Sequence, residues 1–381
     1  MSVTLQGIFR LGFERYARSR RLPLHVHQAA RAIQQCRTAA LGGHISACPD
    51  GHTIRVHYNS CRHRACPQCA HLRIDRWLEA RARQLLPCDH YHAIFTVPHE
   101  LEPLWQANRP LLGHFLFTAV RDTLLELLED PKYLAARPGV IATLHTWGRT
   151  LSFHPHVHCL VTGGGFAASR WKAVRPGFLL PVRVVRALFR GKLLAALRHA
   201  LAQGRLALPP DTSRTRTENL LRQLGRTTWN VRIQERYPHG RGVLVYLGRY
   251  LRGGPLGNRR LVSAHDERVV FRYTDHRDGH PKTLALPLEH FVQRITWHVP
   301  EPRRHVVRYW GLYARGQATE CEAARRQLGP RGPAAPTLPA SPRDERGCDV
   351  PSQAVCPVCG QPLVLRAVWG RGREPPHGLL A

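Results

Sequence analysis

The sequence predicts an α+β protein in which a helical, cysteine-rich segment precedes a larger part built from antiparallel strands and helices. Two strand-like segments are joined by a short turn, and the second of them carries three alternating histidines. Long stretches around them place apolar residues at helical spacing. Ahead of both, cysteines stand at the spacing of metal ligands. The 381 residues are enough for two or three domains.

The charge balance restricts the class of partner. The chain has 56 Lys and Arg residues against 26 Asp and Glu residues, which gives a formal net charge of +30. Because arginine binds phosphate in a bidentate manner, this excess favours nucleic acid over a membrane surface. The sequence has no apolar run of the roughly 18–20 residues that a membrane span needs, and the N-terminus lacks the order of a signal peptide. We therefore expect a cytoplasmic protein without a membrane partner.

The N-terminal residues 1–35 are expected to form two helices. Apolar residues recur at helical spacing between Leu5 and Tyr16, although Gly12 on the same face weakens the pattern. Pro23 interrupts the pattern, and a second helical run begins near Val26.

Residues 36–88 are expected to form a zinc-binding domain followed by a basic helix over 71–86. Cys66-Pro-Gln-Cys69 is a C-x-x-C knuckle, and Cys61 and Cys48 can complete a tetrahedral structural zinc site. Other side chains could replace one of these ligands: His52, Cys36, His44 and His63. A redox role is disfavoured because no thioredoxin-like βαβ pattern follows. Basic residues at the knuckle, Arg62 and Arg64 among them, suit contact with DNA.

The middle of the chain alternates strands and helices. We expect a strand over 91–97, a long helix over 110–129 and a strand over 140–147 that reverses at residues 148–150. Further elements are expected in this order: a strand over 178–185, a helix over 188–201, a strand over 228–233, a hairpin from 271–274 and 282–286, and a helix over 288–298.

The strand that follows the reversal at residues 148–150 carries the candidate catalytic metal site. It is expected to form an antiparallel hairpin with the strand over 140–147. His154, His156 and His158 alternate along it, so they project from one face, and Gly163–Gly165 are expected to end the strand. Imidazole is the commonest protein metal ligand, so three of them can converge on a metal ion. The alternative is a half-buried strand with one polar face. His145 on the preceding strand would lie nearby, as a ligand, as a partner of a ligand, or as an ordinary strand histidine.

Tyr246 and Tyr250 are candidate nucleophiles. They stand four residues apart and therefore share a face. A tyrosine hydroxyl can attack a phosphodiester and leave a covalent phosphotyrosine. Because a free tyrosine titrates near pH 10, the attack needs help from a metal ion or from cations such as Arg249 and Arg252. The alternative is aromatic packing with the hydroxyls at the rim.

The C-terminal part changes in character. Residues 316–355 read as a Pro- and Gly-rich linker that is expected to be disordered. Cys356-Pro-Val-Cys359 in the tail 356–381 is a second knuckle, with Cys348, His377 or Cys321 as further ligands. The second knuckle is expected to be either a small zinc ribbon or a remnant that binds no metal.

Several motifs carry a resemblance to a known family. His156-Val157-His158 is similar to the His-hydrophobic-His motif of the HUH endonuclease superfamily. More narrowly, the chain resembles rolling-circle transposases of the insertion sequence ninety-one family from about residue 10 to 315. The segments that match the family in order are Ser60–Cys69, Phe95–Leu101, Leu144–Gly165, Tyr246–Arg252 with Pro255 and Asn258–Leu261, and Val307–Leu312.

The resemblance implies a catalytic domain over 89–315 with a five-stranded antiparallel HUH sheet of the RRM or ferredoxin-like type. It implies Mg²⁺ or Mn²⁺ on His156 and His158, to which we add His154 as the first choice of third ligand. Tyr246 and Tyr250 would form 5′-phosphotyrosine links to single-stranded DNA at insertion-element ends, in a bacterial, nucleoid-associated enzyme. The chain departs from the family in having Cys48-Pro-Asp-Gly51 in place of a C-x-x-C pair, and in Gly253-Gly254 after the tyrosine segment.

Three other functions compete with this one. A non-catalytic, zinc-dependent DNA-binding or regulatory protein would account for the cysteines and the charge, but leaves the histidine strand unexplained. A transposase with three carboxylates on a ribonuclease-H-like core needs acidic residues at strand ends, and the expected strands supply none. A zinc hydrolase that activates water on the three histidines would need neither tyrosine.

Overall fold

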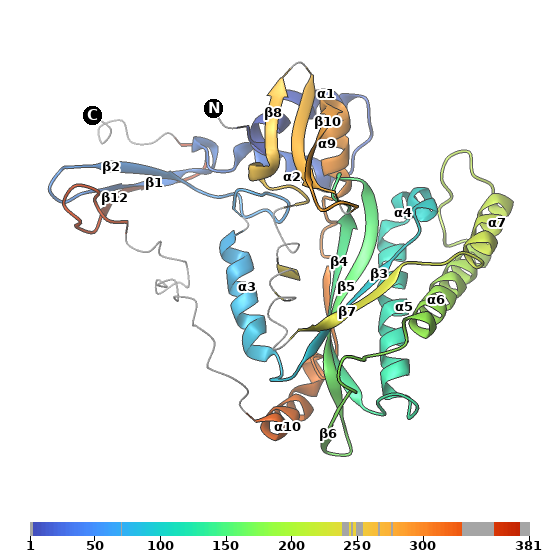
Figure 1. The fold of residues 1–381 in the computed structure, drawn as a ribbon. Coiled ribbons are helices and arrows are strands. Elements are labelled where there is room, and N and C mark those ends of the chain that lie inside the picture. Colours follow the sequence, from blue (N-terminus) through green and yellow to red (C-terminus); the bar gives the residue numbers. More distant parts are fainter. Residues whose placement is uncertain are drawn as a thin grey trace. The chain divides into compact units, whose positions relative to one another are not determined.

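The computed structural model describes residues 3–69, 71–237, 244, 247–248, 254–265, 267–275, 277–329 and 354–373 (Figure 1). The chain divides into two compact units, each assembled from separate stretches of sequence. Unit 1 comprises Met1–Arg73, Arg252–Pro300 and Pro333–Ala381, and unit 2 comprises Ile74–Leu251 and Glu301–Gly332. This division differs from the linear order of domains that the sequence suggested, because the C-terminal knuckle belongs to the same unit as the N-terminal helices.

The helices of unit 1 pack through small residues. α1 (Leu5–Arg18) begins where the Thr4 hydroxyl accepts a hydrogen bond from the Gly7 N–H, and α2 (Leu24–Gln35) begins after Pro23, as predicted. α9 (Leu288–Trp297) packs against α1. Gly12 makes this approach possible, because a Cβ there would lie 2.8 Å from Leu288 Cγ.

Unit 1 also contains two antiparallel sheets of three strands each. One sheet has the order β12-β1-β2, from β1 (Gly43–Ala47), β2 (Ile54–Tyr58) and β12 (Val364–Trp369). The other has the order β10-β9-β8, from β8 (Leu261–His265), β9 (Arg268–Thr274) and β10 (Pro281–Pro287). The predicted hairpin of β9 and β10 is confirmed. The pairing of β12 with β1 was not expected from the sequence.

Unit 2 is built on one antiparallel sheet of six strands, where five were expected. Its order is β11-β4-β5-β3-β7, with β6 added beside β5. The strands are β3 (His90–Thr96), β4 (Arg137–Trp147), β5 (Phe153–Ala167), β6 (Arg170–Ala173), β7 (Val231–Tyr237) and β11 (Val307–Gly311). The predicted antiparallel hairpin of β4 and β5 is confirmed and lies in the middle of this sheet.

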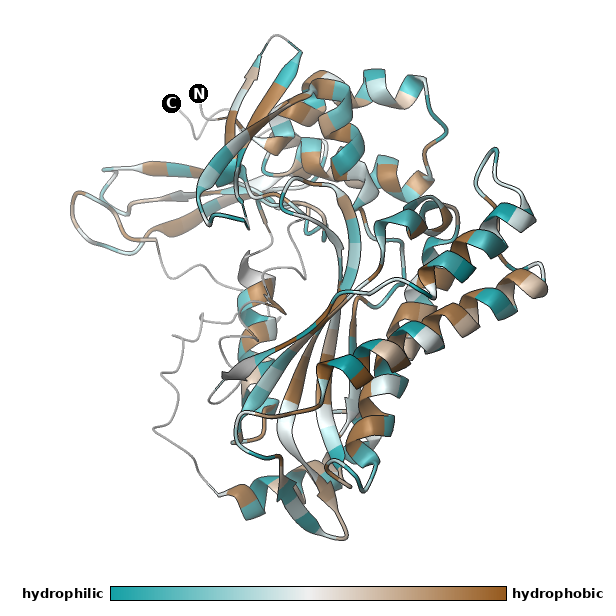
Figure 2. Cartoon of the chain, turned by 45° about the vertical axis from the view of Figure 1, so that its right-hand side comes forward, coloured by the Kyte–Doolittle hydropathy of each residue, from teal (hydrophilic) through white to brown (hydrophobic). Residues whose placement is uncertain are grey.

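Two long helices cover one face of this sheet. α5 (Arg109–Glu129) contacts β4 and β5, and α6 (Val182–Ala202) contacts α5 and β7 (Figure 1). Hydrophobic and hydrophilic residues alternate around α6 in Figure 2. α4 (Glu102–Ala107) and α7 (Arg214–Leu224) lie next to α5 and α6, respectively. Two further helices are α3 (His71–Gln84) and α10 (Ala318–Leu328). Within the described ranges, the helices lack the combination of length and apolar character that crossing a membrane requires.

Three sequence predictions about these elements were wrong. The strand expected over 178–185 is absent, because α6 begins at Val182 directly after Pro181. The expected linker over 316–355 contains α10 in its first part. Gly163–Gly165 do not end β5, which continues to Ala167. These glycines instead admit close neighbours, since a Cβ on Gly164 would lie 2.5 Å from the Trp171 ring.

Candidate metal centres

The register of β4 and β5 places three histidines on one face of the sheet. His145 pairs with His156, and Thr143 pairs with His158. Because alternate residues of a strand share a face, His145, His156 and His158 project together. One ring nitrogen from each of the three lies within 4.8 Å of the others. We call this group the histidine cluster, and the side of the sheet that carries it the histidine face.

The composition of the histidine cluster differs from the expected set in one position. The expected pair His156 and His158 is brought together, and His145 takes the place that the sequence assigned to His154. His154 shares the face, with its ring centroid 5.2 Å from that of His156, but it lies outside the group. His145 is favoured because it sits directly across from His156 on the neighbouring strand, whereas His154 is displaced along the same strand.

Burial keeps these rings neutral. Removal from water lowers the pKa of His156 to about 4 and lowers the pKa of His158 further. The pKa of the fully buried His145 also falls well below its usual 6.5, again chiefly through burial, with repulsion from neighbouring rings as a smaller cause. The rings are therefore unprotonated near neutral pH, which is the form that binds a metal ion.

Hydrogen bonds set the tautomers of two rings in the histidine cluster. Gln234 Oε1 only accepts, so His92 Nδ1, at 2.8 Å, donates to it. His92 Nε2 then accepts from His158 Nδ1, also at 2.8 Å, which puts the lone pair of His158 on Nε2. Likewise His156 Nδ1 donates to the His154 carbonyl at 2.6 Å, which puts its lone pair on Nε2. Metal-binding histidines are usually oriented by such a bond from the second nitrogen.

The donor set fits a divalent cation. His145, His156 and His158, three neutral imidazoles from two adjacent strands, would hold such a cation, which would supply Lewis-acid chemistry. The sequence reasoning missed His92. The sequence placed His92 in the expected strand over 91–97. It could not show that this strand lies beside β5, where His92 pairs with Leu160 next to the histidine cluster.

Leucines that flank the expected nucleophiles pack on the histidine face. Leu244 and Leu247 are buried in one hydrophobic cluster with Ile141 and Leu160, which pair with each other on the face that carries His158. A Cβ on Gly248 would lie 2.6 Å from Leu78 Cδ2 of α3. Leu244, Leu247 and Gly248 are therefore fixed against this side of unit 2. The residues expected to act there lie outside the described part of the chain: Tyr246, Tyr250, Arg249 and Arg252.

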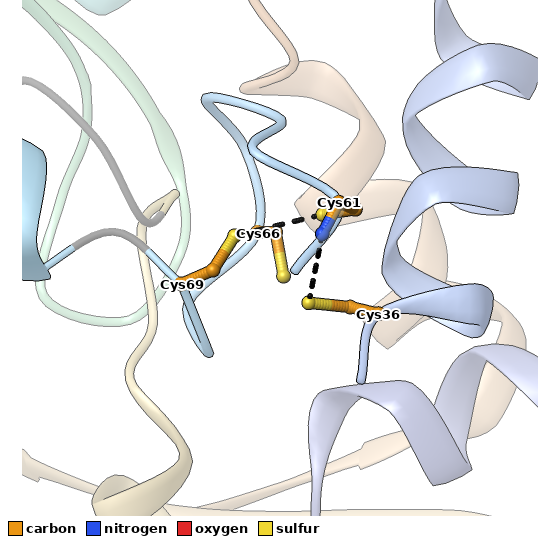
Figure 3. Close-up of side chains that lie close together, drawn as sticks. All are labelled: Cys36, Cys61, Cys66 and Cys69. Carbon is orange, nitrogen blue, oxygen red and sulfur yellow. Dashed lines mark hydrogen bonds between the residues drawn. The ribbon is translucent and has the colours of Figure 1, made fainter. Parts of the chain in front are cut away.

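Four cysteines of unit 1 form a second candidate metal centre. Cys36 at the end of α2, Cys61 after β2, and Cys66 and Cys69 of the knuckle place their sulfur atoms within 4.8 Å of one another (Figure 3). Cys61 Sγ lies 3.6 Å from Cys69 Sγ, and the Cys61 N–H points at Cys36 Sγ at 3.5 Å. Hydrogen bonding from Cys61 lowers the pKa of Cys36 to about 7, which favours the thiolate. Four thiolates at this spacing fit a structural zinc ion.

The Cys₄ centre also differs from the expected ligand set. Cys36, which the sequence offered as an alternate, stands with Cys61, Cys66 and Cys69, and Cys48 does not. Cys48 and His52 lie instead beside Cys356 and Cys359. The two arginines proposed for DNA lie on either side of His63, directly after Cys61, with Arg62 exposed and Arg64 half-buried.

Comparison with known proteins identifies two matching family models and two similar proteins. Residues 139–320 match a family model described as a putative transposase, and residues 8–97 match one described as a transposase zinc-binding domain. The chain is 36% identical over 341 residues to the putative transposase y4qJ of Sinorhizobium fredii (strain NBRC 101917 / NGR234), covering 87% of this chain and 86% of that protein. It is 32% identical over 287 residues to the transposase for insertion sequence element IS801 of Pseudomonas savastanoi pv. phaseolicola, covering 73% of this chain and 68% of that protein. No solved structure matches significantly.

Proposed function

This chain belongs to the IS91 family of transposases with an N-terminal zinc-binding domain, and from that premise we propose that it moves DNA by a tyrosine mechanism. It cleaves and rejoins single-stranded DNA at the ends of an insertion element through 5′-phosphotyrosine intermediates, in rolling-circle transposition. The observation that carries the proposal is the convergence of His145, His156 and His158 within 4.8 Å on one face of the antiparallel sheet. We assign this sheet to the HUH type, with the His-hydrophobic-His motif on β5.

The histidine cluster would hold Mg²⁺ or Mn²⁺. Such a cation, when bound, neutralises the scissile phosphate and stabilises the departing 3′-oxygen. His92 and the His154 carbonyl hold the rings of His158 and His156 in the tautomer that presents Nε2. Because desolvation lowers the pKa of the rings, they are neutral near neutral pH, and the site needs no deprotonation before the cation binds.

Tyr246 and Tyr250 are the proposed nucleophiles. The phenol oxygen of one tyrosine forms a bond to the phosphorus while the bond from phosphorus to the 3′-oxygen breaks. The proton lost by the phenol is balanced by one taken up by the leaving oxygen, which becomes a free 3′-hydroxyl, and the 5′ end of the DNA stays on the tyrosine. In the reverse reaction, the 3′-hydroxyl of another strand attacks the phosphotyrosine. This attack joins the two DNA strands and releases the tyrosine. The burial of Leu244 and Leu247 on the histidine face supports this assignment, because Leu247 directly follows Tyr246.

DNA is the partner that transposase membership implies, and a net charge of +30 suits it. We propose that Arg62 and Arg64 beside the Cys₄ centre contact the phosphate backbone, together with Arg249 and Arg252 near the tyrosines. The Cys₄ centre and the zinc-binding domain support a structural Zn²⁺ that shapes this surface.

A covalent-adduct assay tests the mechanism. The purified chain is incubated with labelled single-stranded element ends and Mg²⁺ or Mn²⁺, and the products are separated before and after protease digestion. We expect a protease-sensitive adduct that a Tyr246→Phe/Tyr250→Phe variant cannot form, while the matched control Tyr273→Phe on β9 still forms it. Cleaved DNA without an adduct would indicate a metal-dependent hydrolase, and DNA binding without cleavage would indicate a regulatory protein. Either outcome would overturn the tyrosine mechanism.

A further inference from the structure

A second group of metal-binding side chains joins residues from opposite ends of the sequence. Cys48, His52, Cys356 and Cys359 all belong to unit 1, and one ligand atom from each lies within 4.8 Å of the others. Cys48 Sγ lies 3.5 Å from Cys359 Sγ, which is 311 positions away in the sequence, and 3.6 Å from His52 Nδ1. In a tetrahedral zinc site, bond lengths of about 2.3 Å to sulfur and about 2.0 Å to nitrogen separate two sulfurs by about 3.8 Å, and sulfur from nitrogen by about 3.6 Å. The observed spacings match these dimensions.

Two tight turns at one end of a sheet build the group. Cys48 and His52 belong to the turn between β1 and β2, where the Cys48 N–H donates to the Thr53 carbonyl at 2.9 Å. Cys356 and Cys359 belong to the turn before β12, where the Cys356 N–H donates to the Gln361 carbonyl at 2.8 Å. Because Ala47 pairs with Val364, the antiparallel register of β1 and β12 brings the two turns together.

The C-terminal turn repeats a detail of the Cys₄ centre. The Val358 N–H points at Cys356 Sγ at 3.4 Å, and the His63 N–H points at Cys61 Sγ at 3.4 Å. In both places the donor stands two residues after the cysteine. A backbone N–H directed at sulfur stabilises the thiolate form, which is the form that binds zinc.

In the sheet that carries this group, the central strand β1 buries Ile45 and Ala47, but the two outer strands bury little apolar surface. On β12 Trp369 is buried, but Leu365 and Val368 are 62% and 68% exposed. β2 buries none of its side chains fully. A small segment with so little core commonly depends on a metal ion for its folding free energy.

We propose that Cys48, His52, Cys356 and Cys359 bind a second structural Zn²⁺. This ion fastens β12 and its knuckle to the β1–β2 hairpin and so completes the zinc-binding domain with residues from the C-terminal part of the chain. The proposal is independent of the tyrosine mechanism. We call this group the Cys₃His centre.

Metal analysis of the full chain tests the Cys₃His centre. Counted in a His145→Ala background, so that the histidine cluster adds no ion, the chain should contain two zinc ions, and Cys356→Ser/Cys359→Ser should contain one. Cys36→Ser, which removes a ligand of the Cys₄ centre, should also contain one. The matched control Cys321→Ser, which changes a cysteine outside both groups, should retain two. A content of one ion in this background that does not fall in Cys356→Ser/Cys359→Ser would overturn the proposal.

Cobalt substitution distinguishes ligand loss from unfolding. Co²⁺ in a Cys₃His site absorbs differently from Co²⁺ in a Cys₄ site, so the wild-type spectrum should be the sum of both. His52→Cys should keep two metal ions and shift the spectrum to that of two Cys₄ sites, whereas His52→Ala should weaken one site. If Cys356→Ser/Cys359→Ser loses both ions, the cobalt spectrum of His52→Cys tests the ligand assignment. A spectrum identical to that of the wild type would overturn the proposal. A Cys48–Cys359 disulfide in the intact mass of protein purified under non-oxidising conditions would also overturn it.

Discussion

His92 Nε2 lies 2.8 Å from His158 Nδ1, in a contact that joins β3 to β5 across the histidine face. The other nitrogen of His92 is held by Gln234 on β7, so three strands cooperate to orient one ring of the histidine cluster. Neither His92 nor Gln234 belongs to the cluster itself. Their contribution is to fix the tautomer and the orientation of His158.

This chain of contacts predicts the effect of two substitutions at one position. Gln234→Leu removes the acceptor for His92 and should weaken Mn²⁺ binding by about tenfold to a hundredfold, since that is the usual effect of losing such a partner. Gln234→Glu keeps an acceptor oxygen and should bind Mn²⁺ at least as tightly as the wild type. Calorimetric titration of each variant measures the affinity. Equal affinities for the two variants would show that His92 needs no partner.

The exchange of His154 for His145 can be tested directly. His145→Ala removes a member of the histidine cluster and should abolish measurable Mn²⁺ binding and adduct formation. His154→Ala leaves the group of three intact and keeps the backbone carbonyl that His156 uses, so it should bind Mn²⁺ within a few-fold of wild type. A larger loss in His154→Ala than in His145→Ala would restore His154 as the third ligand.

The buried histidines predict a loss of stability in acid. Burial lowers the pKa of His156 to about 4, and the same cause lowers the pKa of each of its neighbours His92, His145 and His158. The unfolded chain takes up protons near pH 6.5, so below that pH the unfolded state binds more protons than the folded state. The free energy of unfolding should therefore fall by about 1.4 kcal/mol per pH unit for each ring that stays neutral.

Thermal unfolding of the zinc-containing protein, without added Mg²⁺ or Mn²⁺, measures this effect. The Tm should be nearly constant above about pH 7 and fall steadily as the pH is lowered through the range between 6.5 and about 4. His156→Asn removes one titrating ring and should make the slope shallower. A Tm that does not vary with pH in this range would contradict the burial of neutral rings.

Tyr313 supports the edge of the same sheet. Its hydroxyl accepts a hydrogen bond from the Leu86 N–H at 3.1 Å. Because His90 Nδ1 donates to the Cys88 carbonyl, His90 Nε2 carries the lone pair, and the Tyr313 hydroxyl donates to it at 2.8 Å. Tyr313→Phe leaves a buried donor and a buried acceptor without this partner. It should lower the free energy of unfolding by about 1–3 kcal/mol, measured by urea denaturation. The half-buried Tyr309→Phe is the control and should change it by less.

The fold was predictable where local pattern decides it. The helix over 110–129 and the β4–β5 hairpin followed from periodicity and from the turn at Gly148, and the structure contains both. The strand expected over 178–185 failed because Phe178–Val185 are apolar without regular alternation, and Pro181 starts a helix there. The apolar residues in this segment suited a helix as well as a strand.

The site was predictable within a strand but not between strands. His156 and His158 share a face by alternation alone, whereas the choice of His145 needed the register that pairs it with His156. The sequence assigned Cys48 to the zinc site and offered Cys36 only as an alternate, whereas the structure groups Cys36 with Cys61, Cys66 and Cys69. What separates them is the pairing of β12 with β1, which draws Cys48 toward Cys359. A contact between residues 311 positions apart leaves no local trace in the sequence.

The place of β1 between β2 and β12 also constrains when unit 1 can fold. A ribosome makes β1 (Gly43–Ala47) long before β12 (Val364–Trp369), so one edge of β1 lacks this partner while the residues between them are synthesised. An open strand edge is a template for pairing with other chains. A nascent transposase that lacks β12 therefore exposes a strand edge for aggregation or strand exchange, which the pairing of β12 with β1 closes. Unit 1 can be completed only after translation has passed Trp369.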